Sequence, residues 1–298
     1  MKSFPYSIET ITPLFLGGAS PQEQAEIRAP SIRGQLRWWF RVLGGSFQEE
    51  CEVFGSIEKD SPTASALIVR VTDYKSRDQW TPSNHQANPN SSYLYFFASK
   101  SQDGARWRAK GALSPGSSFE LHLSWRRPIR PSVRSLFELA LESFLLLGSL
   151  GLRSTRGLGC FETQERPFTE PAFESLKREI QTRMPEFLFG WSRFQGAQDQ
   201  LEDALGGPLR GLRDGWSAGT PHRSNPTPLG SSSPRQASAV HLRPIRVSNG
   251  AYRILVFEAP ATRVLGKESR ARGPRLHDEV PPPKDAPGRR PHLGYRHS

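Results

Sequence analysis

Short segments with the two-residue hydrophobic period of a β-strand alternate along this chain with segments that have the 3.6-residue period of an α-helix. Strands are expected at residues 4–18, 66–72, 93–98, 118–125 and 160–163, and a hairpin at 240–259 around Asn249-Gly250. Helices are expected from Ser31, as N-cap, to Gly44, and at 132–147 and 173–184. This order predicts an α+β fold of the ferredoxin-like kind, with two such domains packed together.

The 298 residues are long enough for one large domain or two smaller ones. We expect an N-terminal ferredoxin-like domain at 1–130, a C-terminal ferredoxin-like domain at 131–262, and a basic tail at 263–298. The tail is rich in proline and arginine and has no apolar period, which is typical of a disordered segment. Two interpretations of the tail stay open: an RNA-binding extension, or a dispensable or aberrant terminus.

The charge balance restricts the class of partner. Forty Lys and Arg residues against 29 Asp and Glu residues give a net charge of +11, which favours nucleic acid or an anionic membrane surface. No apolar run reaches the roughly 20 residues that span a bilayer. The N-terminus lacks a signal-peptide pattern, and two cysteines cannot form a disulfide framework or a four-ligand zinc set. We therefore expect a cytoplasmic protein with no membrane partner and no metal.

The segment SIRGQLRWWFRVLGG at 31–45 combines a core-facing stripe with positive charge. Arg33, Arg37 and Arg41 stand at i, i+4 and i+8 beside that stripe, and we call them the arginine row. Like charges at this spacing repel, so an anion is expected to satisfy the row. A core helix with a solvated basic edge explains the same pattern. Trp38, on neither face, either stacks on a base or packs against a neighbouring element.

Residues 148–159 form a second informative segment, the glycine-rich loop. Gly148, Gly151, Gly157 and Gly159 enclose the run Arg153-Ser154-Thr155-Arg156. Glycines let a backbone expose N–H groups to an anion, and here Arg153 and Arg156 are expected to clamp a sugar-phosphate backbone. A helix precedes this loop and a strand follows it, which is the reverse of Rossmann and Walker loops, so no nucleotide cofactor is expected. A helix C-cap with a tight turn would explain one or two of the glycines, but hardly four.

These segments together resemble a known family. The chain reads ITPLFLGGA, then EIRAPSIRGQLRWWFRVLGG, VFGS at 53–56, GLRSTRGLGCFE in the glycine-rich loop and RQASAVHLRPIRV at 235–247. This pattern is similar to the RAMP superfamily of CRISPR-associated RNA-binding proteins, and within it to the first subunits of Cmr (type III-B) effector complexes. The resemblance covers about residues 8–259, and the segment after about Thr262 matches nothing in it.

The resemblance implies two ferredoxin-like (RRM-related) domains in a RAMP fold. It implies a non-catalytic subunit near the 3′ end of the guide RNA that helps capture single-stranded target RNA for antiviral defence. The implied partners are guide RNA, target RNA and other Cmr subunits, with no cofactor. Carried onto matching positions, the implied RNA-binding residues are Arg28, Arg33, Arg37, Trp38, Arg41, Arg153, Ser154 and Arg156.

Two other classes of function stay open. The first is a RAMP-type, metal-independent endoribonuclease that processes guide RNA, which usually needs a placed histidine or a similar group with a pKa near 7. His122 and His241 alternate with apolar residues on expected strands, and the other histidines lie in loops or the tail. The acidic run Glu49, Glu50 and Glu52 is interpreted as a solvated face, and no hydrolase or metal-site motif occurs. We expect no enzyme. The second class is a purely structural assembly subunit.

Overall fold

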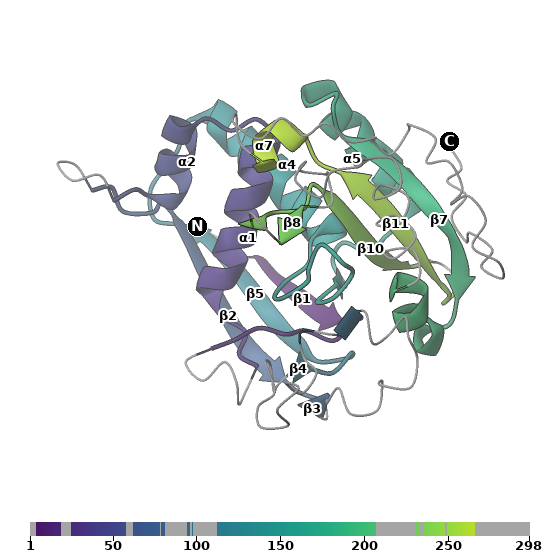
Figure 1. Cartoon of the computed structure of the whole chain (residues 1–298). Helices are drawn as coiled ribbons and strands as arrows, with labels where there is room; N and C mark the ends of the chain where they lie inside the picture. The colour runs from purple at the N-terminus through teal and green to yellow at the C-terminus, as the bar shows by residue number, and fades with distance from the viewer. Residues whose placement is uncertain are drawn as a thin grey trace. The chain divides into compact units, whose positions relative to one another are not determined.

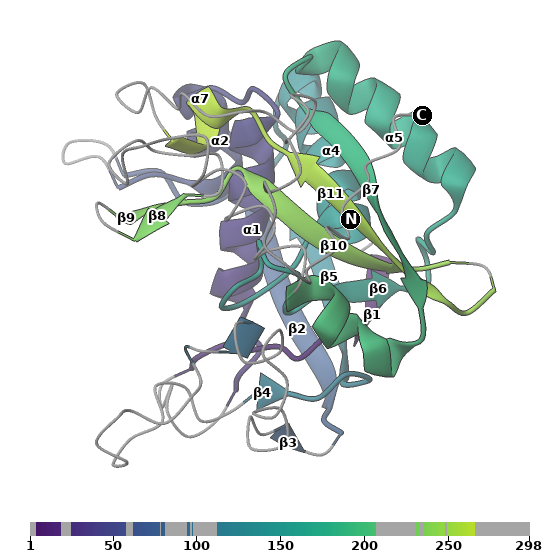
Figure 2. The same ribbon diagram turned by 45° about the vertical axis from the view of Figure 1, so that its right-hand side comes forward.

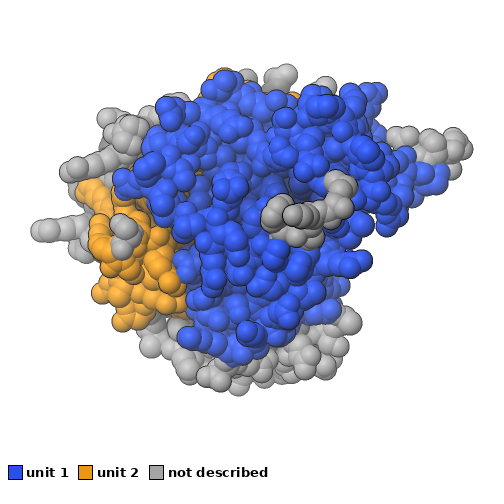
Figure 3. Space-filling model, turned by 180° about the vertical axis from the view of Figure 1, so that it is seen from behind, with its two compact units in different colours: residues 1–81, 109–154, 158–184 blue, residues 82–108, 155–157, 185–298 orange. Residues whose placement is uncertain are grey.

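The computed structural model describes residues 4–18, 25–57, 62–77, 79–80, 94–95, 97, 112–206, 230–232, 235–247 and 249–265. The chain divides into two compact units, which Figure 3 colours separately. Unit 1 contains residues 1–81, 109–154 and 158–184. Unit 2 contains residues 82–108, 155–157 and 185–298. Each unit is therefore assembled from segments that are distant in the sequence.

Unit 1 contains a four-stranded antiparallel sheet with the strand order β2-β5-β1-β6 (Figure 1). Along the chain, β1 (Phe4–Thr10) is followed by α1 (Ala29–Val42), α2 (Phe47–Phe54) and β2 (Leu67–Lys75). The second half consists of β5 (Ser118–Trp125), α4 (Pro131–Leu147) and β6 (Phe161–Thr163). Apart from the extra helix α2, this is the βαββαβ order of a ferredoxin-like domain. The unit also contains the two-stranded pair of β3 (Gln79–Trp80) and β4 (Ala112–Leu113), and α5 (Glu170–Arg183).

Alternation along the strands of unit 1 separates a core face from an open face. Ile8 lies opposite Phe119, and Val69 opposite Leu123, on the face that meets the helices. The aromatic rings of Trp125 and Phe137 meet edge to face at 5.0 Å, which fixes α4 against β5. The opposite face of the central strands β1 and β5 carries only Pro5, Ser7, Glu9, Ser118, Glu120, His122 and Ser124.

Unit 2 contains a three-stranded antiparallel sheet with the order β10-β11-β7 (Figure 2). Its strands are β7 (Leu188–Gly196), β10 (Val240–Arg246) and β11 (Tyr252–Glu258). The hairpin expected around Asn249-Gly250 is confirmed: Gly250 has a φ of 79°, and the Asn249 side chain accepts a hydrogen bond from the Ala251 N–H at 3.0 Å. Smaller elements are η3 (Gln198–Gln200), β8 (Ser231–Ser232), β9 (Arg235–Gln236) and α7 (Ala261–Leu265).

The α+β class is confirmed, and most of the expected helices and strands form at the expected places. The expected strand at 93–98 is wrong where it can be checked, because Leu94 and Tyr95 are helical.

The expected domain boundary between residues 130 and 131 does not coincide with the division into units. Residues 131–154 and 158–184 belong to unit 1, because α4 packs against α1 and β6 pairs with β1. Three strands are described in the unit 2 sheet, so a second ferredoxin-like domain stays a prediction.

The basic tail expected at 263–298 can be followed only at its start. Residues 263–265 complete α7, and the rest lies outside the described residues. In the part of the chain that the structure describes, no helix combines the length and apolar character needed to cross a membrane.

Candidate nucleic-acid interface

Helix α1 positions the arginine row. The helix begins at Ala29 with Arg28 as N-cap, three residues earlier than the expected N-cap Ser31. Pro30 lies in the first turn, where its fixed φ is compatible with the helix and its missing N–H has no partner to lose. Ile32, Leu36 and Phe40 are fully buried, so the apolar stripe packs inward as its period predicts. The arginine row consequently emerges along one edge of the helix.

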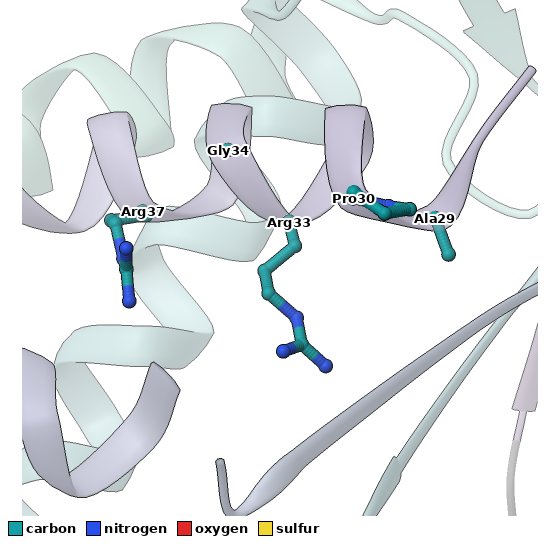
Figure 4. A pocket seen from close by; sticks show the side chains of 5 residues that line it. All are labelled: Ala29, Pro30, Arg33, Gly34 and Arg37. Atoms are coloured by element: carbon teal, nitrogen blue, oxygen red, sulfur yellow. The ribbon is translucent and has the colours of Figure 1, made fainter. Parts of the chain in front are cut away.

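Arg33 and Arg37 each donate a hydrogen bond to a backbone carbonyl. Nη2 of Arg33 lies 3.2 Å from the oxygen of Leu67 at the start of β2, and Nη2 of Arg37 lies 3.3 Å from the oxygen of Gly55. The two side chains point the same way from the helix and line an open pocket of about 280 Å³ (Figure 4). Ala29, Pro30 and Gly34 complete the lining. We call this cavity the α1 pocket.

The third member of the row, Arg41, is held by Glu50 of α2. Nη2 of Arg41 lies 2.6 Å from Oε1 of Glu50, and Nε of Arg41 donates to Oε2. Nε of Arg37 lies 3.2 Å from the same carboxylate, although its N–H is poorly aligned for a hydrogen bond. The hydrogen bond to Glu50 raises the pKa of Arg41. The Glu50 carboxylate is therefore an anion within the protein that satisfies part of the arginine row.

The interpretation of the acidic run as a solvated face is wrong for Glu50, and each of the other two carboxylates has a partner within the chain. Glu50 is only 4% exposed and pairs with Arg41. Glu49 completes a capping box with Ser46, and the hydrogen bond from the Ser46 backbone N–H lowers the pKa of Glu49. Burial acts to raise the pKa of Glu52, but hydrogen bonds from the backbone and side chain of Arg130, both at 2.7 Å, outweigh it and lower that pKa.

Arg126 belongs to the same region and was missed from the sequence. It directly follows β5, and its backbone N–H donates to the oxygen of Ala66 at 2.7 Å, next to the carbonyl that holds Arg33. Burial, and then the positive charges of Arg37 and Arg126, lower the pKa of Arg33. Neither Arg33 nor Arg126 has a carboxylate partner among the described residues. The run RRPIRP at 126–131 was the available sequence signal.

The two remaining candidates on α1 are less informative. Arg28 is exposed beside the first turn, and its side chain does not cap the helix. Trp38 is half-buried, and its ring meets that of Trp39 edge to face at 5.0 Å. Contact with Trp39 explains the position of the Trp38 ring without a ligand, so base stacking by Trp38 stays a prediction.

Packing within each unit explains all four glycines of the glycine-rich loop. A Cβ at Gly151 would lie 2.2 Å from the Phe15 oxygen, and one at Gly159 would lie 1.9 Å from the Leu150 oxygen. A Cβ at Gly148 would lie 2.3 Å from a carbonyl of α4, and one at Gly157 would lie 2.4 Å from Leu205. A helix C-cap and a tight turn were the only alternatives to an anion site considered from the sequence, and close packing was not considered. The glycines give no independent support for an anion site.

The polar residues of this loop fall in different units. Arg153 has a left-handed φ of 55°, and the carbonyl of Ser154 accepts a hydrogen bond from Ser149 Oγ at 2.9 Å, both in unit 1. Arg156 belongs to unit 2, where it forms a parallel bridge with Leu242 of β10. A joint clamp by Arg153 and Arg156 stays a prediction.

The buried strand histidine, His241, does not have the surroundings of a general base at neutral pH. The His241 ring stacks on Phe257 at 4.6 Å, and burial, together with the charge of Arg156, lowers its pKa to about 3. A group with that pKa is neutral at pH 7 and a weak base, poorly matched to proton transfer there. Nε2 of His122 lies 2.9 Å from Thr72 Oγ1 on the open face of the unit 1 sheet. In the described ranges, no cluster of three or more His, Cys, Asp or Glu residues is arranged to hold a metal ion.

Comparisons with known proteins agree with the resemblance seen in the sequence. Two curated relatives are the CRISPR system Cmr subunits Cmr1-1 and Cmr1-2 of Pyrococcus furiosus, at 32% identity over 172 residues and 29% over 181 residues. The matches cover 52% and 53% of this chain, and 45% and 94% of the two relatives. The matched segment thus spans less than half the length of Cmr1-1.

Solved structures share the fold. The crystal structure of apo Cmr1 from Pyrococcus furiosus matches with a TM-score of 0.57 at 22% identity, over 87% of this chain and 89% of that one. A chain in the cryo-EM structure of type III-B Cmr-β bound to cognate target RNA matches with a TM-score of 0.50 at 10% identity, over 86% and 94%. A family model of the RAMP superfamily matches residues 7–162, more than half of the chain. The chain therefore belongs to the RAMP superfamily.

Proposed function

We propose that this chain is a non-catalytic, RNA-binding subunit of a type III-B CRISPR (Cmr) effector complex. In this role it lies near the 3′ end of the guide RNA, works in the cytoplasm with the other Cmr subunits, and helps capture single-stranded target RNA for antiviral defence. The similarity to Cmr1 proteins and to a chain of an RNA-bound complex supports the assignment to a Cmr complex. The observation that carries RNA binding is the α1 pocket, where Arg33 and Arg37 lie beside Arg126.

The geometry favours contact with the RNA backbone. Guanidinium groups suit phosphate, and such contacts are independent of sequence and sensitive to salt. The open face of the unit 1 sheet offers no Phe, Tyr or Trp on β1 or β5 for the base stacking that RRM domains use, and it carries Glu9 and Glu120. Arg41 contributes less to RNA binding than its place in the row implies, because Glu50 already neutralises it. We therefore assign the contact to the edge of α1.

The first prediction tests this assignment. Arg33→Ala/Arg126→Ala removes two charges that lack a carboxylate partner, so we expect the affinity for a fluorescent single-stranded RNA of about 20 nucleotides to fall at least tenfold. The slope of log affinity against log salt is expected to become less steep, by the amount that corresponds to about two lost phosphate contacts. Fluorescence anisotropy across a salt series measures both quantities.

The matched control is Arg178→Ala/Arg193→Ala, which removes two exposed charges from α5 and β7. If both double variants lose the same affinity, binding follows net charge and the assignment to α1 fails. If the unaltered chain binds no RNA at all, the purely structural role replaces RNA binding.

The RNA should also emerge intact on a denaturing gel. Cleavage that disappears in His122→Ala would favour the endoribonuclease.

A further inference from the structure

Gly34 occupies a position where nothing in the part of the chain that the structure describes requires a glycine. It lies in the interior of α1 and is exposed, and a Cβ built there would meet no atom within 4 Å. Its φ is not positive, in contrast to Gly151, Gly159 and Gly250. Gly151 and Gly159 are also required by close packing, and Gly250 by its turn. For Gly34 neither backbone conformation nor packing supplies the reason.

A glycine in a helix interior also makes the helix less stable than an alanine would, because the glycine backbone loses more freedom on folding. The missing side chain at residue 34 leaves bare backbone on the surface of α1. A further reason for a glycine in such a place is the close approach of another molecule to the bare backbone.

The surroundings of Gly34 indicate what approaches. Gly34 lines the α1 pocket with Ala29 and Pro30, so this part of the wall has little side chain above the helix backbone. Arg33 and Arg37 border the same pocket, and both side chains point away from the helix in Figure 4. Bare helix backbone beside two guanidinium groups suits a flexible, anionic chain whose sugar needs room next to its phosphate. An acidic protein segment would share the charge but not the repeating phosphates that two fork-shaped groups hold best.

We propose that Gly34 is a contact point at which one sugar–phosphate unit of an RNA strand lies directly against the backbone of α1, with its phosphate between Arg33 and Arg37. This inference rests on the proposed function, and it adds a residue whose contribution is the absence of a side chain. It assigns the strand a path across the N-terminal half of α1, at residues 29–37.

Gly34→Ala separates this role from a structural one, because the two roles predict opposite signs. Alanine fits the empty space and favours the helix, so the melting temperature of the full-length protein should rise by about 1–4 °C. The same methyl group would stand between the strand and the helix, so the Kd for a single-stranded RNA of about 20 nucleotides should rise at least about tenfold. Gly34→Gln, with a longer side chain, should weaken binding further without unfolding the helix.

Gln35→Ala is the matched control, because it introduces an alanine one residue along the same helix and outside the pocket lining. Its RNA affinity should equal that of the unaltered chain. If Gly34→Ala and Gly34→Gln bind RNA as the unaltered chain does while Arg33→Ala/Arg126→Ala does not, the proposed function stands and the contact at Gly34 is refuted. If the unaltered chain does not bind RNA, the proposed function and this inference fall together. If Gly34→Ala keeps its RNA affinity but weakens association with a Cmr subunit, the bare backbone serves a protein partner and the inference is overturned.

Discussion

Glu50 determines which arginines of α1 are left for an external anion. The 3.6-residue period predicts that Arg33, Arg37 and Arg41 share an edge, and the structure confirms it. The period cannot reveal that α2 folds back and places a buried carboxylate against the end of that edge. This depends on the turn after α1 and on the packing of a second helix. The sequence therefore identified the row correctly but did not reveal the ion pair that holds Arg41 at its end.

The buried position of Glu50 leads to a stability prediction. Glu50→Gln removes the charged partner of Arg41 and keeps the shape of the side chain. Because Arg41 is 55% exposed and can be solvated in the variant, we expect the free energy of unfolding to fall by about 1.5 kcal/mol. Glu138→Gln is the comparison, because it removes an exposed partner of Arg134 on α4 and should cost about 0.5 kcal/mol. Urea denaturation followed by circular dichroism measures both. Equal losses in the two variants would show that the Glu50 pair is no stronger than a surface pair.

The helices and strands differ in how far local sequence determines them. Helix α4 was expected at 132–147 and forms at Pro131–Leu147, because its apolar period extends over more than four turns. The glycine-rich loop was interpreted as an anion nest, whereas close packing accounts for its glycines without a ligand. The Phe15 carbonyl that excludes a side chain at Gly151 lies 136 residues earlier in the chain. Glycines selected by distant packing and glycines selected by a ligand look the same in a sequence.

Gly159→Ala tests the packing explanation of this loop. The residue has a φ of 61°, which disfavours any L side chain, and its Cβ would collide with the Leu150 carbonyl. We expect a loss of at least about 2 kcal/mol in the free energy of unfolding. Gly34→Ala provides the opposite case in the same unit, since it should increase stability. Thermal denaturation shows whether the melting temperature rises or falls in each variant. An unchanged melting temperature for Gly159→Ala would contradict the packing explanation.

For the whole molecule, composition and the order of elements predicted the fold class but not the division of the chain into two units. The α+β class followed from the alternation of periods, and the RAMP motifs at residues 8–56 identified the superfamily. A boundary at residue 130 assumed that each domain is one continuous stretch of chain. Pairing of β6 with β1 returns the chain to unit 1 after α4, and a hydrophobic pattern does not record such a partner.

A prediction at this scale concerns the end of the chain. Residues 266–298 contain eight Lys and Arg residues against four Asp and Glu residues. A chain ending at Leu265 keeps α7 and loses this charge. We expect its RNA affinity at 0.15 M salt to fall about threefold or less, well below the loss in Arg33→Ala/Arg126→Ala, and its salt dependence to decrease. Anisotropy titrations of the two proteins at matched salt give the comparison. A greater loss in the shortened chain would move the main RNA contact to the tail.

Residues 155–157 belong to unit 2, while the residues on both sides of them belong to unit 1. The backbone N–H of Leu242 donates to the carbonyl of Thr155 at 3.1 Å, so this short piece is fastened to β10. The glycine-rich loop thus begins and ends in unit 1, while its middle belongs to unit 2. At this loop, a shift of one unit against the other is absorbed by rotation about the φ and ψ bonds that flank the planar peptide links 154–155 and 157–158. Such rotation would reorient the side chains of Arg153 and Arg156, which stand on opposite sides of the link between residues 154 and 155.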